Sequence, residues 1–118
     1  MSQTELAEKA IELLKKLISI QSYSGEENVT ADLIESYLKE HGFNPQRKLN
    51  NVWAFAEPRN PDKPTILLNS HHDTVKATNK WTYDPFTPNI VDGKLIGLGS
   101  NDAGGPLMSL LHTFIHLA

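Results

Sequence analysis

Two short stretches of the sequence hold residue types that can bind a metal ion. The first is the triplet His71-His72-Asp73, which directly follows an apolar run typical of a buried strand. Residues two apart at a strand end point the same way, so His71 and Asp73 can share a face. An imidazole that binds metal through one nitrogen usually donates its other N–H to a carboxylate. We therefore predict His71 as a ligand and Asp73 as its orienting carboxylate. In the alternative, Asp73 caps a turn and the histidines pack at a sheet edge.

The second stretch is the glycine-rich loop 97–105, which contains one carboxylate, Asp102. Glycines let a backbone adopt positive φ or pass close to an ion, so this loop can present both Asp102 oxygens inward. In the alternatives, Asp102 only caps the next helix, or the loop holds a phosphate. The loop lacks both the Lys-Ser/Thr pair of a P-loop and the dinucleotide glycine spacing, which disfavours phosphate. Because the chain has no cysteine, this histidine and aspartate suit zinc best.

Helices and strands must position these residues. Apolar residues at helical spacing predict amphipathic helices over residues 4–20 and 25–41. Ser24 and Glu27 have capping-box spacing at the start of the second helix, and Gly42 suits its C-terminal cap.

Later segments predict strands and a buried helix. Strands are expected at 51–56 and 65–70, and Asp92-Gly93 predicts a hairpin between short apolar runs. Residues from 105 or 106 to 118 are apolar on nearly every side and end without a cap, so we expect the N-terminal piece of a longer protein. The predicted fold class is α/β, a layered domain with a mixed sheet and helices on both faces. His112 and His116 lie four apart on one face of the last helix, where they could bind zinc, but without a third ligand a packing or surface role is expected.

Composition narrows the function classes. The 118 residues suit one domain, which would bury roughly two-thirds of its unfolded surface. A formal charge of -3 and no dense basic patch argue against nucleic acid as a partner. The polar, acidic N-terminus and the lack of any apolar run of about 18 residues predict no signal peptide and no membrane span. A cytoplasmic location is expected.

The order of motifs resembles a known family. Three runs of residues, in this order, look like the N-terminal part of the di-zinc aminoacylase and carboxypeptidase family. They are residues 71–75, the run Trp81-Thr-Tyr-Asp-Pro-Phe86 and the run from Asp92 to Asp102. Within that family the acetylornithine deacetylase branch is the most similar. The resemblance covers essentially the whole chain, and it implies the N-terminal part, residues 1–118, of a zinc-peptidase-like α/β/α catalytic domain.

The resemblance also implies roles for single residues. His71 would bind one zinc, Asp73 would orient His71, and Asp102 would bridge two zincs, with a cis peptide bond to Ala103. Cobalt or another divalent ion is an alternative metal. The family pattern further needs a Glu-Glu pair, a later acidic ligand and a later histidine, yet no glutamate follows Glu57. The chain is therefore expected to hold only part of a site and to be inactive alone.

The implied activity is hydrolysis of the amide bond of a small N-acyl amino acid. N-acetylornithine, a substrate of arginine biosynthesis, is the leading candidate, and a desuccinylase or a dipeptidase/carboxypeptidase of the same family is the alternative. The resemblance also implies a homodimer, formed through a further lid or dimerisation domain. From another class, a stand-alone binding domain would keep both motifs as turn and cap devices and bind no zinc stably.

Overall fold

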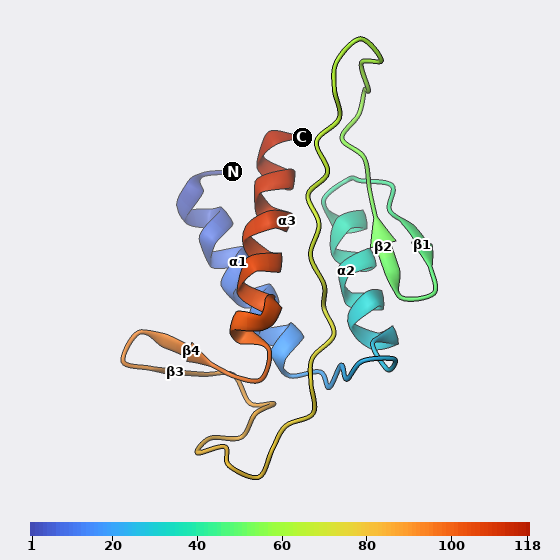
Figure 1. Ribbon diagram of the computed structural model, residues 1–118. Coiled ribbons are helices and arrows are strands. Elements are labelled where there is room, and N and C mark those ends of the chain that lie inside the picture. Colours follow the sequence, from blue (N-terminus) through green and yellow to red (C-terminus); the bar gives the residue numbers. More distant parts are fainter.

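The computed structural model describes residues 1–118 and contains three helices (Figure 1). Helix α1, Gln3–Ile18, begins with a capping box in which Glu5 N donates to Ser2 Oγ over 3.1 Å and Ser2 N donates to the Glu5 carboxylate over 3.4 Å. Helix α2 spans Asn28–Glu40 and helix α3 spans Gly105–Leu117. All three predicted helices are thus confirmed, with ends shifted by a few residues.

The start of α2 differs from the prediction. Its N-cap residue is Glu27, whose side chain makes no capping hydrogen bond. Ser24 does not form the expected capping box, because its hydroxyl donates to Asp73 instead, over 2.6 Å. The predicted end is confirmed, since Gly42 follows α2 with φ of 86°.

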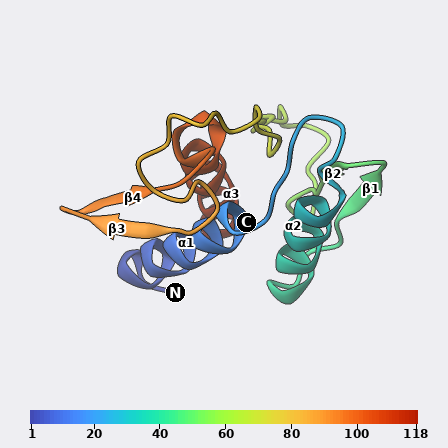
Figure 2. The same cartoon turned by 90° about the horizontal axis from the view of Figure 1, so that it is seen from below.

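The three helices share one small hydrophobic core. Figures 1 and 2 show α1 and α3 side by side, with α2 on the other side of a long extended segment. The core residues are Leu13, Leu17, Ile34, Leu38, Leu107, Met108 and Leu111. The chain exposes 8013 Å², against about 6,400 Å² expected for a folded monomer of this mass. It therefore buries less surface than the predicted two-thirds. No helix has the length and apolar character needed to cross a membrane.

Two antiparallel hairpins supply all the paired strands. Strand β1, Gln46–Lys48, pairs with β2, Asn51–Trp53, and β3, Asn89–Val91, pairs with β4, Lys94–Ile96. Asp92 and Gly93 between β3 and β4 have φ of 51° and 74°, as a two-residue hairpin turn of the primed type requires. That hairpin is confirmed. Strand β1 was not predicted, and β2 ends at Trp53 rather than at residue 56.

The predicted layered mixed sheet is absent. Figure 2 shows the two hairpins at opposite ends of the molecule, so they do not join one sheet. The predicted strand 65–70 lies extended but unpaired, with Ile66 82% and Leu67 84% exposed. A strand is defined by hydrogen bonds to its neighbours, and no neighbouring strand lies beside this segment. The fold prediction was therefore wrong for these 118 residues in its sheet, although its helices were right.

Candidate metal centre

The two stretches singled out by sequence meet in space. Nε2 of His71 lies 3.0 Å from Oδ1 of Asp102, although the residues are 31 positions apart. His71 follows the extended segment 65–70, and Asp102 lies in the turn Ser100–Gly104 just before α3. The His71 side chain is 49% exposed and the Asp102 side chain 87% exposed, so the contact is open to solvent.

Asp73 occupies the other nitrogen of the same ring. Nδ1 of His71 lies 3.1 Å from Asp73 Oδ1 and 3.2 Å from the Asp73 carbonyl oxygen. The imidazole thus has a carboxylate at each nitrogen, and the arrangement matches the predicted pairing of His71 with Asp73. The second Asp73 oxygen, Oδ2, accepts the 2.6 Å hydrogen bond from Ser24 Oγ. Sequence reasoning missed Ser24 as a member of this group.

These contacts shift two pKa values in opposite directions. The hydrogen bond from Ser24 is the largest cause that holds the Asp73 pKa below its ordinary value, and it outweighs burial, which raises that pKa. Burial lowers the pKa of His71, but the Asp73 carbonyl and the charges of Asp73 and Asp102 outweigh it, so this pKa lies above its ordinary value. The contacts thus shift each pKa in the direction that favours the charged form of its side chain.

The glycines around Asp102 allow close packing of the backbone. Gly99 has φ of 80°, and Gly104 N donates to Gly99 O over 2.7 Å. A Cβ atom on Gly104 would lie 2.7 Å from Leu14 Cδ1, so this part of the turn presses against α1. Asp102 does not cap α3, whose N-cap is Gly104. The Asp102–Ala103 peptide bond is cis, as the family resemblance implied.

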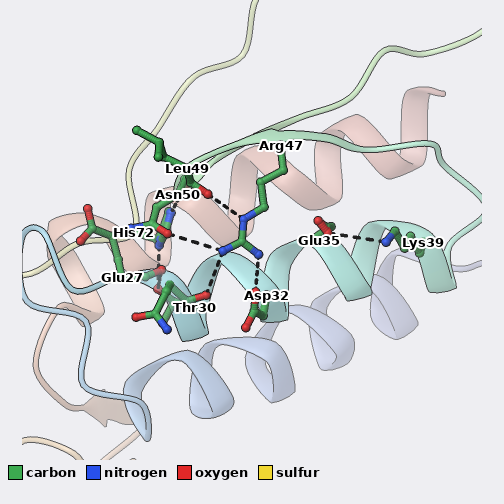
Figure 3. A network of polar contacts seen from close by, with 10 residues as sticks. Glu27, Thr30, Asp32, Glu35, Lys39, Arg47, Leu49, Asn50 and His72 are labelled. Atoms are coloured by element: carbon green, nitrogen blue, oxygen red, sulfur yellow. Dashed lines mark hydrogen bonds and ion pairs between the residues drawn. The ribbon is translucent and has the colours of Figure 1, made fainter.

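His72, the middle residue of the triplet, has a supporting role. Figure 3 shows its ring turned toward α2 and the β1–β2 hairpin. Nδ1 lies 2.7 Å from Thr30 Oγ1, and Nε2 lies 2.9 Å from the Asn50 carbonyl oxygen. The adjacent Arg47 pairs with Asp32 of α2. Both ring nitrogens of His72 are therefore engaged by protein atoms, and the ring anchors the loop that carries His71.

The ligand types fit zinc, but they are incomplete. Zinc takes imidazole nitrogen and carboxylate oxygen, and bond lengths of about 2.0–2.2 Å place two such atoms roughly 3.3–3.5 Å apart in a tetrahedral site. The 3.0 Å between His71 Nε2 and Asp102 Oδ1 is close to that separation, and the exposed Asp102 side chain is free to move by a few tenths of an ångström. No group of three or more His, Asp or Glu side chains gathers in a metal-binding arrangement. His71 and Asp102 thus fit as two ligands of a larger set.

Comparison with known proteins agrees with this chemistry. Residues 67–118 match the model of Peptidase family M20/M25/M40. A succinyl-diaminopimelate desuccinylase of Polynucleobacter necessarius subsp. necessarius is 31% identical over 112 residues, which cover 86% of this chain and 29% of that protein. The same enzyme of Hydrogenovibrio crunogenus is 36% identical over 101 residues, 80% of this chain and 26% of the relative. A probable carboxypeptidase of Emericella nidulans is 34% identical over 101 residues, 80% of this chain and 24% of the relative.

The site places one imidazole between two carboxylates, a set of donor atoms that suits a bound metal. Residues 67–118 resemble peptidase family M20/M25/M40, and the relatives named above align with most of the chain. The chain spans between 24% and 29% of the length of these relatives. The predicted family is therefore supported, while the acetylornithine deacetylase branch is not, because the matched relatives carry the names of desuccinylases and a carboxypeptidase.

Proposed function

We propose that residues 1–118 form the N-terminal part of the catalytic domain of a zinc-dependent hydrolase that cleaves the amide bond of an N-acyl amino acid. The observation that carries the proposal is the imidazole of His71, placed between the carboxylates of Asp73 and Asp102. One carboxylate can orient the ring while the other shares a metal with it.

An N-succinyl amino acid of the diaminopimelate type is the best-supported substrate. Relatives named succinyl-diaminopimelate desuccinylase align with 80% or more of the chain at 31% and 36% identity. Peptides with a free C-terminus come second, because a probable carboxypeptidase aligns at 34% identity. N-acetylornithine, the substrate first expected from the motifs, comes third.

Each site residue has a separate task in the proposed mechanism. His71 would bind the metal through Nε2, and Asp73 would keep the proton on Nδ1 so that Nε2 stays free. Asp102 would be the second ligand, and its two oxygens allow it to bridge a pair of ions. Bound zinc, or cobalt in its place, supplies a polarised water and a Lewis acid for the scissile carbonyl. A general base must come from residues other than these three, since all three are committed to the metal or its ligand.

The test is hydrolysis by the zinc-loaded product of the complete reading frame that contains these residues. Release of diaminopimelate from its N-succinyl derivative, ornithine from N-acetylornithine and the C-terminal amino acid from a peptide would be compared at equal enzyme concentration. We expect the succinyl substrate to be fastest and a chelator to stop its turnover. Absence of hydrolysis of all three would contradict the proposal.

The 118-residue chain provides a second comparison. We expect it to be inactive alone and at best a weak binder of one zinc, because it supplies two of the usual four ligands. Tight binding of two zincs in a calorimetric titration of this chain would refute that expectation. A homodimeric full-length protein and a cytoplasmic location stay predictions, to be checked by sedimentation and by cell fractionation.

A further inference from the structure

Residues 22–24 lie directly beside the loop that carries the candidate site. Thr74 N donates to Ser22 O over 2.8 Å, and Ser24 N donates to Thr74 O over 3.2 Å. These two bonds form an isolated parallel bridge between Tyr23 and Thr74. The short segment before α2 therefore holds the backbone of residues 72–74 from one side.

Two serine hydroxyls extend this contact beyond the backbone. Ser22 Oγ donates to the His72 carbonyl oxygen over 3.0 Å, and Ser22 is only 3% exposed. Ser24 Oγ donates to Asp73 Oδ2 over 2.6 Å. In an extended segment, residues two apart point to the same face, so both hydroxyls reach the same loop. Ser22 thus binds the loop backbone, and Ser24 binds the Asp73 side chain.

The Ser24 contact determines how the Asp73 carboxylate is presented. Oδ1 faces His71 Nδ1 over 3.1 Å, while Oδ2 takes the Ser24 hydroxyl. A carboxylate held at one oxygen can rotate about its terminal torsion, which is broad for aspartate, whereas a carboxylate held at both oxygens cannot. The torsion matters because Asp102 contacts the other ring nitrogen of His71 and competes for its proton.

We propose that Ser24 is a positioning residue, which acts through Asp73 to keep the proton on Nδ1 of His71 and leave Nε2 for a metal. The metal-binding part of this inference rests on the proposed function. The chain of contacts from Ser24 through Asp73 to His71 does not depend on it. Ser24 is exposed and lies outside the hydrophobic core. Loss of its hydroxyl should therefore disturb the proton position on His71 more than the stability of the fold.

A double-mutant cycle of Ser24→Ala and Asp73→Asn tests the coupling. Zinc affinity would be measured by competition with a chelator, in the complete protein. We expect Ser24→Ala alone to weaken binding about tenfold and Asp73→Asn about 10- to 100-fold, as outer-sphere substitutions do. In the Asp73→Asn background, Ser24→Ala should add no further loss. Additive losses, or an unchanged affinity in Ser24→Ala, would overturn the proposal.

Two control variants separate positioning from folding. Ser24→Thr keeps a hydroxyl and should restore the affinity. Ser19→Ala removes another exposed hydroxyl, which donates only to Lys16 O, and should leave the affinity unchanged. Thermal unfolding of each variant checks that the fold persists. A loss of affinity in Ser19→Ala equal to that in Ser24→Ala would contradict a specific role.

A metal-free readout keeps this test independent of the proposed function. Nitrogen-15 NMR of the 118-residue chain, at a pH where the His71 ring is neutral, reports which ring nitrogen carries the proton. We expect Nδ1–H in the unaltered chain and a mixture of both tautomers in Ser24→Ala. The same tautomer in both chains would overturn the inference. A shift of tautomer in a protein that hydrolyses none of the three substrates would support Ser24 while refuting the proposed activity.

Discussion

The hydroxyl of Tyr37 donates a hydrogen bond to Nε2 of His112 over 2.7 Å and so joins α2 to α3. Nδ1 of His112 in turn donates to Met108 O, also over 2.7 Å. His112 is only 6% exposed, so of the two expected roles, packing or surface, it has the packing role. Burial is the largest cause that lowers the pKa of His112, and the positive charges of His41 and Lys9 act in the same direction.

Acid should therefore destabilise the fold through His112. Its folded pKa lies below the ordinary value of 6.5, so the ring takes up a proton more readily in the unfolded chain. The free energy of unfolding should fall as pH drops below about 6.5 and level off below the folded pKa, by about 1.4 kcal/mol per unit of pKa difference. Urea unfolding of the chain between pH 8 and pH 5 measures this effect. His112→Gln should flatten the slope, and an equal slope in both chains would contradict the assignment.

Removal of the Asp102 carboxylate should abolish the proposed activity. Asp102→Ala takes away one of the two candidate ligands, so we expect turnover to fall below detection and bound zinc to decrease. Metal content after dialysis and hydrolysis of the succinyl substrate give the two measurements. Asp62→Asn removes a charge from an exposed turn before the extended segment 65–70 and serves as the matched control. Full turnover in Asp102→Ala would rule out a ligand role.

Asp73→Asn should impair catalysis without abolishing it. The amide can donate as well as accept a hydrogen bond, so it no longer selects the Nδ1–H tautomer of His71. We expect kcat/KM to fall about 10- to 100-fold at saturating zinc. Wild-type kcat/KM in this variant would mean that Asp73 has no orienting role.

Gly99 should tolerate no side chain. It has φ of 80°, and a Cβ there would lie 2.6 Å from Thr74 Cγ2. Gly99→Ala should cost about 1–2 kcal/mol for the backbone conformation and about 1–3 kcal/mol for the steric contact. Gly93→Ala is the matched control, since Gly93 has φ of 74° with nothing within 4 Å of its Cβ position. Urea unfolding should show the larger loss in Gly99→Ala, and equal losses would exclude the contact with Thr74.

The isolated chain should self-associate through its unpaired extended segment. Ile66 and Leu67 are 82% and 84% exposed on a backbone whose ladder groups have no strand partner. We expect sedimentation velocity of the 118-residue chain to show concentration-dependent association, and Ile66→Lys to reduce it. Lys63→Ile is the control, because it adds apolar surface in the neighbouring turn, outside the extended segment. It should change the association less than Ile66→Lys does. A monomer at all concentrations would contradict this role.

Local patterns predicted the helices and one hairpin correctly. Helical periodicity and the Asp92-Gly93 turn are encoded within a few residues, so they hold whatever surrounds them. The layered sheet failed because strand pairing is a long-range property, and residues 65–70 find no partner among these 118 residues. Strand β1, Gln46–Lys48, was missed because three polar residues carry no alternating pattern.

The candidate site was predictable in part for the same reason. His71 and Asp73 are two residues apart, and the family's order of motifs connects them with Asp102. Ser24 could not be found this way, since its spacing from Glu27 matches a capping box and nothing local points to Asp73, which lies 49 positions later. Ser22 and Ser24 stand two positions apart in an extended stretch, a spacing that places both side chains on one face.

The long separations around His71 have a kinetic consequence. Ser22 reaches His72 across 50 positions, Ser24 reaches Asp73 across 49, and Asp102 reaches His71 across 31. Loops of this length close only after local turns have formed, because their closure entropy must be overcome before the contacts form. We therefore expect the helices to fold first and the loop that carries the candidate site to fold last. Its amides should exchange with solvent earliest, and the candidate metal ligands should meet only after the helices have formed.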